Sequence, residues 1–275
     1  MARRADTPEA LDQTWLQTHC DQAWSLWQSL QTQLDETHPG VQLHWLTPGP
    51  DSHCEDLILA LTCRNDPLLG DKPFWIDFTA GQKAHRQRFG GGKGQPLARA
   101  ILGKHPSHLP RVLDATAGLA NDGYVIAQLG CEVTLMERLP VMAALIDNGL
   151  QRVRRLEDVA PDSAEVCQRI RVIEADAAAW MHAHPAAFDV VYLDPMYPHT
   201  NKRAAAKKGM QILQRLAGPD QDSDQLLSAA LQTATHRVVV KRPKGAPPLA
   251  GPAPHAAIKS PNTRYDLYSI QAMTP

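Results

Sequence analysis

The chain has 275 residues, 43% of them hydrophobic and 21% charged, with a formal net charge of −1; this suits one large domain, or one domain with a smaller attachment, and excludes a uniformly basic nucleic-acid-binding protein. Its five cysteines are scattered without C-x-x-C spacing, so we expect no disulfide framework, no zinc or other metal site, and a cytoplasmic location. The first residues lack the apolar stretch of a secretory signal, and no run of about eighteen apolar residues predicts a membrane-spanning helix.

We expect residues 1–80 to form a small N-terminal α+β domain. Apolar residues recur at helical spacings over residues 8–36, which predicts one or two amphipathic helices. Three strand-like runs follow, separated by Pro, Gly, Asp and Asn, at residues 41–47, 56–63 and 73–79. Core packing is the favoured role, and an RNA or protein contact the alternative, for three tryptophans: Trp15, Trp24 and Trp27.

A different organisation is expected for residues 81–275. A basic, glycine-rich segment comes first and turns into a helix near Pro96. Strands are then expected at residues 111–116, 132–137, 171–176, 188–194, 237–242 and 264–271. Helices are expected between them at residues 121–130, 141–158, 177–184 and around 230–237. This alternation predicts an α/β fold with a doubly wound, Rossmann-like parallel sheet, whose ligands bind outside the carboxyl ends of the strands.

The turn after the first of these strands, DATAGLAND, combines an acid with small residues. Asp114 ends the strand, and Gly118 lets the backbone approach a ligand closely before a helix begins. A dinucleotide site would need G-x-G-x-x-G here, and its absence argues against a Rossmann dehydrogenase. The charge of Asp114 suits a cofactor with an ammonium and a sulfonium group; an ordinary tight turn is the alternative.

Two further acids stand at the ends of the next two strands. Glu137, at the second, could accept hydrogen bonds from ribose hydroxyls. Asp176, at the third, could accept one from an adenine amino group, cap the following helix, or do both. Together with the first turn, these acids describe a pocket for an adenosyl cofactor that needs no phosphate-binding loop.

The fourth strand ends in Asp194-Pro195-Met196-Tyr197. The Asp194 carboxylate and the Pro195 carbonyl could accept hydrogen bonds from an exocyclic amine, while Tyr197 could stack on its base. Because the lone pair of such an amine is delocalised into the ring, acceptors aimed at its protons would make it a better nucleophile. We therefore expect Asp194, Pro195 and Tyr197 to be the catalytic residues of a methyl transfer, although a plain Asp-Pro turn has the same sequence.

These segments together resemble a known enzyme family. DATAGLANDG, TLMER, IEAD and LDPMYP resemble class I S-adenosylmethionine-dependent methyltransferases that act on amino groups, whose signature is an Asp/Asn-Pro-Pro-Tyr/Phe turn. HRQRFGGGKGQPLARA, LDPMYPH, VVVKRP and APPLAG are similar, more narrowly, to the ribosomal RNA small subunit methyltransferase J family, from about residue 56 to the C-terminus. The resemblance implies S-adenosyl-L-methionine as the cofactor and the N2 amine of a guanine in small-subunit (16S) rRNA as the methyl acceptor.

Carried over by position, the resemblance also implies cofactor contacts. It adds Asn121, Asp122, Arg138 and Ala177 to the five already inferred, which are Asp114, Gly118, Glu137, Asp176 and Asp194. The family usually has glycine and arginine where this chain has Ala120 and Asn121, so Asn121 can offer a hydrogen bond but no charge. Met196 replaces the second proline of the general signature, as it does in the narrower family.

The resemblance also gives the basic segments a function in RNA binding. The segment before the sheet contributes His85, Arg86, Arg88 and Lys93, and the one after the fourth strand contributes Lys202, Arg203, Lys207 and Lys208. Phosphate contacts from these side chains would make binding strongly salt-dependent. Lys241 and Arg242 form a weaker candidate patch. Solvated surface is the alternative for every one of these patches.

Two other functions stay open at this stage. The acceptor could be a DNA adenine or cytosine or a protein glutamine amide, because the Asp194 turn alone does not separate these amines. The chain could also be a non-catalytic RNA-binding assembly factor, although a pure binder needs neither a cofactor pocket nor an acceptor turn. The expected partner is small-subunit rRNA or a ribosomal particle, with no membrane partner and a monomer favoured.

Overall fold

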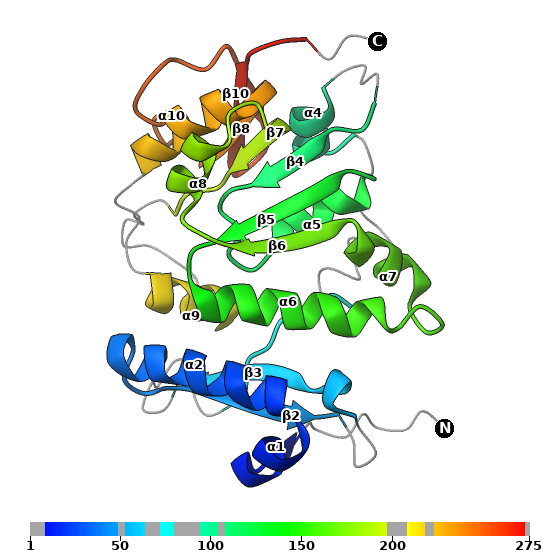
Figure 1. The fold of residues 1–275 in the computed structure, drawn as a ribbon. Coiled ribbons are helices and arrows are strands. Elements are labelled where there is room, and N and C mark those ends of the chain that lie inside the picture. Colours follow the sequence, from blue (N-terminus) through cyan, green and yellow to red (C-terminus); the bar gives the residue numbers. More distant parts are fainter. Residues whose placement is uncertain are drawn as a thin grey trace.

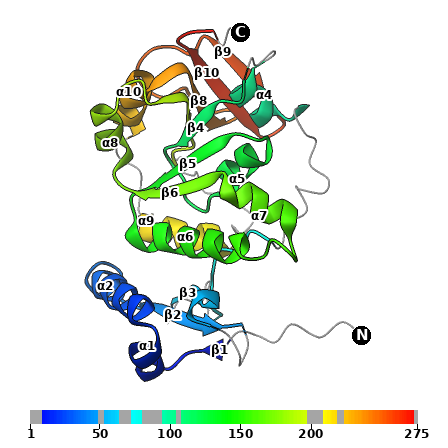
Figure 2. The same ribbon diagram turned by 45° about the vertical axis from the view of Figure 1, so that its right-hand side comes forward.

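The computed structural model describes residues 9–48, 53–63, 72–79, 94–103, 108–196, 208–217 and 223–272. These residues form a three-stranded sheet near the N-terminus and a seven-stranded sheet in the rest of the chain. Figures 1 and 2 show the small sheet and its helices on one side of the molecule, the large sheet on the other, and a long helix between them. Within the described ranges, no helix is both long and apolar enough to cross a membrane.

The N-terminal unit, residues 9–63, consists of two helices on an antiparallel sheet. Its elements are β1 (Glu9–Ala10), α1 (Gln13–His19), α2 (Asp21–Thr37), β2 (Val41–Thr47), the 3-10 helix η1 (Cys54–Asp56) and β3 (Ile58–Cys63). The side chain of Asp12 caps α1 by accepting a hydrogen bond from the Thr14 N–H at 2.7 Å. The predicted helices and the first two predicted strands are therefore present, with β2 at the predicted residues.

Tryptophan side chains attach α2 to the small sheet. The indole of Trp27 donates a hydrogen bond to the Leu43 carbonyl at 3.0 Å, and that of Trp45 donates to the Ala23 carbonyl at 3.0 Å. The three tryptophans of the helical segment all pack against the hydrophobic core. Their predicted packing role is confirmed.

One disulfide joins Cys20 to Cys54, a pairing that the scattered cysteine spacing did not predict. Cys20 lies between α1 and α2, and Cys54 begins η1, which brings the two Cα atoms to 5.9 Å although 34 positions separate them. Sequence spacing does not reveal this pairing because the fold of the N-terminal unit brings the two residues together.

The third strand predicted for the N-terminal unit is wrong. Only Phe74 pairs with the small sheet, through backbone hydrogen bonds to Leu61 of 2.7 and 2.8 Å. The chain then turns away, and the guanidinium of Arg152 donates a 2.6 Å hydrogen bond to the Ile76 carbonyl. Ile76 and Phe78 are buried in the large hydrophobic cluster that contains buried residues of the long helix α6 (Pro140–Arg154). The apolar side chains of this segment therefore pack there and not on the small sheet.

The large sheet has the strand order β6-β5-β4-β7-β8-β10-β9. Its strands are β4 (Arg111–Asp114), β5 (Glu132–Glu137), β6 (Ile170–Glu174), β7 (Phe188–Leu193), β8 (Ala234–Pro243), β9 (Ala256–Lys259) and β10 (Thr263–Ser269). Neighbours from β6 to β8 pair in parallel, whereas β10 is antiparallel to both β8 and β9. The sheet is therefore mostly, not wholly, parallel; β9 was not predicted, and β8 begins within residues expected to be helical.

Helices cover both faces of the large sheet. They are α4 (Pro96–Leu102), α5 (Asn121–Gln128), α6 (Pro140–Arg154), α7 (Pro161–Gln168), α8 (Ala177–Ala183), α9 (Lys208–Ala217) and α10 (Ser223–Thr233). The buried residues of α4, α5, α6 and α7 fall in one hydrophobic cluster, and those of α8 and α10 fall in another. This arrangement confirms the predicted doubly wound, Rossmann-like α/β class; α7 and α9 were not predicted.

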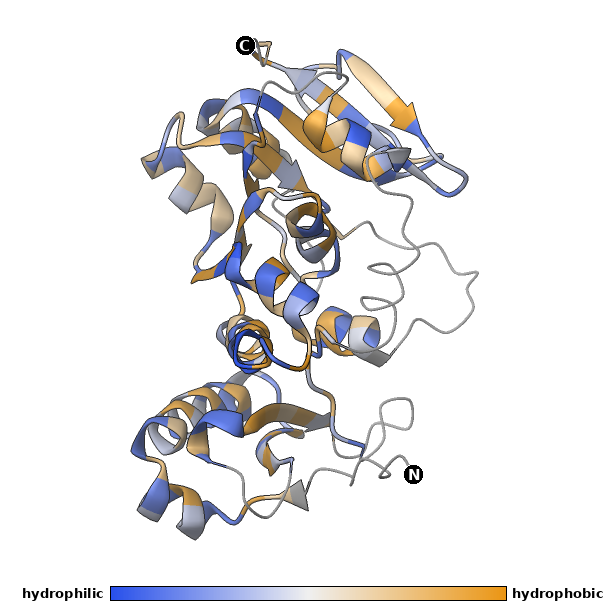
Figure 3. Ribbon diagram, turned by 90° about the vertical axis from the view of Figure 1, so that its right-hand side faces the viewer, coloured by the Kyte–Doolittle hydropathy of each residue, from blue (hydrophilic) through white to orange (hydrophobic). Residues whose placement is uncertain are grey.

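Strand β7 shows how one sequence supplies both clusters. Val190 and Tyr192 belong to the cluster on one face, whereas Val191 and Leu193 belong to the cluster on the other. A strand buried on both faces is apolar along most of its length, and Figure 3 shows hydrophobic stretches alternating with hydrophilic ones along the ribbon. The run therefore lies deep in the fold, and the acid that follows it is held at the edge of the sheet.

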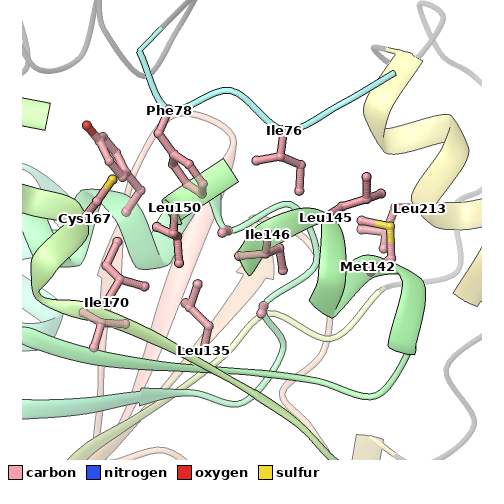
Figure 4. Packing of buried hydrophobic residues seen from close by; sticks show 14 of the residues in the cluster. Ile76, Phe78, Leu135, Met142, Leu145, Ile146, Leu150, Cys167, Ile170 and Leu213 are labelled. Atoms are coloured by element: carbon pink, nitrogen blue, oxygen red, sulfur yellow. The ribbon is translucent and has the colours of Figure 1, made fainter. Parts of the chain in front are cut away.

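Helix α6 joins the large unit to the segment that follows the small sheet. Figure 4 shows Ile76 beside Leu145 and Ile146, and Phe78 beside Leu150. At Gly149 a side chain would be obstructed, because an added Cβ would lie 2.8 Å from the Ile76 carbonyl oxygen. The glycine permits this close contact between helix and chain.

Candidate active site

A cavity of about 410 Å³ opens at the carboxyl ends of the parallel strands. The order in which strands are added to the sheet reverses between β4 and β7. Strands β5 and β6 are added on one side of β4, whereas β7 and β8 are added on the other. Ligands of open α/β sheets bind at this kind of switch point, in cavities of roughly 300–1,000 Å³. The cavity thus lies where the alternation of strands and helices predicted a ligand.

All nine cofactor contacts expected from the sequence line this cavity. They are Asp114, Gly118, Asn121, Asp122, Glu137, Arg138, Asp176, Ala177 and Asp194, and the catalytic candidate Pro195 lines it with them. Tyr197 lies outside the described residues, as do seven of the expected RNA contacts, at His85, Arg86, Arg88, Lys93, Lys202, Arg203 and Lys207. The eighth, Lys208, begins α9, and its side chain is likewise outside the description.

The turn after β4 takes backbone conformations that favour small residues. Gly118 has φ +53°, and Ala120, which precedes α5, has φ 56°. Left-handed backbone at a residue with a Cβ costs roughly 1–2 kcal/mol, so the turn holds Ala120 under strain. With this backbone conformation, Gly118 and Asn121, on either side of Ala120, both line the cavity.

Asp114 is the most deeply buried acid of the site. Its side chain is 1% exposed and accepts hydrogen bonds from the N–H and hydroxyl of Thr116, at 3.1 and 3.4 Å. Burial, with the nearby charges of Asp122 and Asp194, raises the pKa of Asp114 to about 7, against the lowering effects of the Thr116 N–H and Lys241. Asp114 can therefore carry or lose its charge near neutral pH, depending on what occupies the cavity.

Glu137 and Asp176 bond to the protein as well as facing the cavity. The two oxygens of Glu137 accept hydrogen bonds from the N–H groups of Gly118 and Leu139, both at 3.0 Å. Asp176 caps α8 by accepting the Ala179 N–H at 2.8 Å. Each carboxylate oxygen has two lone pairs, so both acids keep acceptor capacity toward the cavity while their orientations are fixed.

One lysine connects two of the carboxylates. The Lys241 ammonium, near the end of β8, lies 2.6 Å from Asp122 Oδ2 and 2.8 Å from Asp194 Oδ2. The Tyr192 hydroxyl donates to the same Asp122 oxygen at 2.7 Å. Burial lowers the pKa of Lys241, but Asp194 and Asp122 outweigh it and raise that pKa above its ordinary value. The interpretation of Lys241 as part of an RNA-binding patch is therefore corrected: its charge is used inside the cavity.

The backbone after β7 is held as firmly as the side chain of Asp194. The Asp194 N–H donates a 2.7 Å hydrogen bond to the Thr116 hydroxyl, which ties the β7 turn to the β4 turn. Burial raises the pKa of the Asp194 carboxyl, and the charge of Lys241 opposes that shift. The carboxylate is 39% exposed where it lines the cavity, so it remains open to an incoming group.

The composition of the cavity suits a cationic adenosyl cofactor. Acids outnumber bases in its lining, which contains the basic residues Arg138 and Lys241 and five acids: Asp114, Asp122, Glu137, Asp176 and Asp194. Such an excess attracts a sulfonium or ammonium and repels a pyrophosphate. The lining also contains apolar side chains, among them Met210 and Leu213 of α9. The residues present could therefore hold S-adenosyl-L-methionine.

Three residues of the network were missed as site members in the sequence. In the sequence, Lys241 belongs to a candidate RNA-binding patch. Thr116 belongs to the turn after the first strand of the large sheet, and Tyr192 to the buried fourth strand. Lys241 could have been found, because it stands near the end of a strand on the same edge as the acids. The contacts of Thr116 and Tyr192 depend on how the β4 and β7 ends meet, which no local pattern records.

The chain is similar to methyltransferases over most of its length. Residues 51–270 match the family described as "Putative SAM-dependent methyltransferase". The chain is 48% identical to ribosomal RNA small subunit methyltransferase J of Hydrogenovibrio crunogenus over 245 residues, covering 88% of this chain and 86% of that protein. It is 50% identical to the protein of the same name from Pseudomonas aeruginosa over 202 residues, covering 73% and 76%. A SAM-dependent methyltransferase structure from Neisseria gonorrhoeae aligns with a TM-score of 0.61 at 34% identity, covering 84% of this chain and 83% of that one.

Proposed function

The chain belongs to the family of SAM-dependent methyltransferases that contains the ribosomal RNA small subunit methyltransferases J, and from this premise we propose that it methylates the exocyclic N2 amine of a guanine in small-subunit rRNA. The observation that carries the proposal is the position of Asp194 and Pro195 on the wall of the cofactor-sized cavity, at the end of β7. Acceptors for an amine and contacts for an adenosyl cofactor therefore share one space.

We assign the cofactor contacts to the strand ends. Glu137 accepts hydrogen bonds from the ribose hydroxyls and Asp176 from the adenine amino group, because each is already oriented by the backbone and retains lone pairs. Asp114 and Asp122 face the cationic end, and Asn121 lies beside them in the same turn. The bound S-adenosyl-L-methionine supplies an electrophilic methyl group on a sulfonium.

The remaining chemistry is positioning of the amine. The Asp194 carboxylate and the Pro195 carbonyl accept hydrogen bonds from its two N–H groups, which directs the nitrogen lone pair toward the methyl carbon. As the N–C bond forms, the C–S bond breaks and its electron pair goes to sulfur. The methylated nitrogen then becomes strongly acidic and loses one proton to water, so no strong base is required. Tyr197 follows Pro195 by two positions and is proposed to stack on the guanine.

The choice of rRNA rests on the relatives and on the basic segments. Both relatives compared above are named as ribosomal RNA small subunit methyltransferases, and the chain covers most of each. Residues 202–208, with four basic side chains, follow the acceptor turn directly, where the phosphates beside an inserted guanine would pass. We propose a cytoplasmic enzyme whose partner is the small subunit or its rRNA.

Labelled S-adenosyl-L-methionine and three acceptors test this function. The acceptors are small subunits isolated without the modification, duplex DNA, and a glutamine-containing protein. We expect label only in the small-subunit rRNA. Label in DNA or in the protein, with none in rRNA, would keep the cofactor and remove the proposed substrate. Cofactor binding without transfer to any acceptor would favour the non-catalytic RNA-binding factor.

A further inference from the structure

We infer that Lys241 is a positioning residue for the methyl transfer: its ammonium orients the Asp194 carboxylate so that one oxygen is kept for the acceptor amine. The inference rests on the proposed function and extends it to a residue outside the acceptor turn. It is derived from the contacts among β4, β7, β8 and α5 rather than from the Asp-Pro motif.

The geometry divides the two oxygens of Asp194 between two tasks. Oδ2 accepts the hydrogen bond from Lys241 at 2.8 Å, whereas Oδ1 has no partner among the side chains and backbone groups that the structure describes. The backbone N–H of Asp194 is bound to Thr116, so the turn cannot rotate freely around the side chain. The carboxylate is held at one oxygen and at the backbone, which leaves Oδ1 as the available acceptor at the cavity.

Lys241 is held as firmly as the group it orients. Its ammonium is bonded to Asp122 as well as to Asp194, and Asp122 is fixed in turn by the Tyr192 hydroxyl. The side chains of Lys241 and Asp122 are 26% and 17% exposed, so little water competes for these bonds. An exposed ion pair is weak because water and salt compete for it. The partly buried pairs of Lys241 are instead fixed by several hydrogen bonds at once.

The charge of Lys241 also sets the protonation of the acceptor. The charged or titratable groups that act on Asp194 come from four elements: Asp114 of β4, Asp122 of α5, Tyr192 of β7, and Lys241 and Arg242 of β8. Burial and Asp122 raise the pKa of Asp194, while Lys241 and Arg242 lower it. Without Lys241 the carboxyl would hold its proton to higher pH and lose an acceptor site.

Three variants separate the charge of Lys241 from its bulk. Lys241→Met keeps the length without the charge, Lys241→Arg keeps the charge, and Lys259→Met removes an exposed lysine of β9 far along the sheet order as the control. Each is measured for cofactor affinity by calorimetry and for the single-turnover rate of methyl transfer to unmodified small subunits between pH 5 and 9. Thermal unfolding confirms that each variant is folded.

We expect Lys241→Met to lower the transfer rate by roughly 10- to 100-fold, the loss typical of removing a group that orients a functional residue. We also expect the acid limb of its rate profile to move to higher pH. Lys241→Arg should recover most of the rate, and Lys259→Met should match the wild type. Affinity for the cofactor should change much less than the rate.

Two results would overturn the inference. A Lys241→Met enzyme with the wild-type rate and acid limb would show that its charge does not act on Asp194. Equal losses of cofactor affinity and rate would make Lys241 a part of the cofactor pocket only. If Lys241→Met does not fold, the double variant Lys241→Met with Asp122→Asn removes one charge of each sign and is compared with Asp122→Asn alone. Equal transfer rates for these two variants would reject the positioning role of Lys241. Failure of the proposed function itself is distinguishable, because the wild type would then transfer no methyl group to rRNA.

Discussion

At the level of single residues, the cavity places three carboxyl groups around one ammonium and gives them different surroundings. Asp114 is 1% exposed, whereas the side chains of Asp122 and Asp194 are 17% and 39% exposed and bind Lys241 directly. A deeply buried acid without a cation at hydrogen-bond distance favours its neutral form. The same residue type therefore serves two purposes in one site: a charge that can be regulated at Asp114, and a fixed acceptor at Asp194.

Burial of Asp114 predicts a specific pH dependence of stability. Its pKa is about 7 in the folded chain against an ordinary value of 3.8, so the folded state binds more protons between those pH values. The free energy of unfolding should then fall as pH rises from about 4 to 7, by up to roughly 4 kcal/mol from this residue. In Asp114→Asn this part of the decline should vanish. Urea unfolding of both proteins at several pH values measures it, and parallel curves would contradict the assignment.

Asp194→Ala should separate transfer from binding. The substitution removes the amine acceptor but leaves Glu137 and Asp176 in their backbone-bonded positions. We expect cofactor affinity to stay within a modest factor of the wild type, while methyl transfer falls by about 100-fold or more. Calorimetry and single-turnover assays give the two quantities. Equal losses in both would make Asp194 a cofactor or folding residue.

The acids of this site could be predicted from sequence, but the bonds among them could not. An apolar strand pattern that ends in an acid is enough to place that acid at the carboxyl edge of a parallel sheet. This applies to Asp114, Glu137, Asp176 and Asp194. Whether an acid is free, capped or paired depends on the partner across the sheet, and Lys241 follows Asp194 by 47 positions. From sequence, Lys241 was therefore only a weak candidate for RNA binding, whereas its charge is paired with the acids beside it.

At the level of elements, residues 73–79 differ from their predicted strand because they pack against helix α6. The apolar run at residues 73–79 has the composition of a strand, but only Phe74 pairs with the sheet. The preference for burying Ile76 and Phe78 against α6 outweighs the propensity to extend the sheet, because the large core is the bigger apolar surface. Propensity within the segment carries no information about that competition.

Gly149→Ala tests the contact that α6 makes there. Alanine would gain about 1 kcal/mol in helix propensity. Its Cβ would, however, lie 2.8 Å from the Ile76 carbonyl oxygen, which belongs to the backbone and cannot simply rotate away. Overpacking typically costs about 1–3 kcal/mol, so we expect a net loss of up to about 2 kcal/mol.

The control for this substitution is Gly245→Ala, because an added Cβ there meets no atom within 4 Å. The free energy of unfolding of Gly245→Ala should lie within about 0.5 kcal/mol of the wild type. A stabilised Gly149→Ala would mean that α6 and residues 75–79 are not held together as described.

At the level of the whole molecule, charge is distributed unevenly between the two units. Between Arg4 and Arg64 the chain has no Lys or Arg. The same stretch has nine acids: Asp6, Glu9, Asp12, Asp21, Asp35, Glu36, Asp51, Glu55 and Asp56. An acidic surface repels phosphates, so the N-terminal unit is a poor RNA-binding surface despite its tryptophans, which pack against the core.

Photo-crosslinking to small-subunit rRNA should show this asymmetry. We expect crosslinked peptides from residues 81–95, which precede the cavity-lining residues, and from residues 197–208, which follow the acceptor turn, and none from residues 9–48. Mass spectrometry of the digested complex identifies them. Crosslinks concentrated on the tryptophan-bearing helices would mean that the N-terminal unit takes part in RNA recognition and that its net charge is a poor guide.

We propose that the end of β7 presents an exocyclic amine to the cofactor, and the identity of the methylated nucleoside is the sharpest test of this. Small subunits methylated by the enzyme are digested to nucleosides, which are separated and compared with standards by mass spectrometry. We expect N2-methylguanosine as the product. A methyl group on a ring nitrogen or on a ribose 2′-oxygen would refute the proposal, because neither atom is an exocyclic amine that can donate hydrogen bonds to both Asp194 and Pro195.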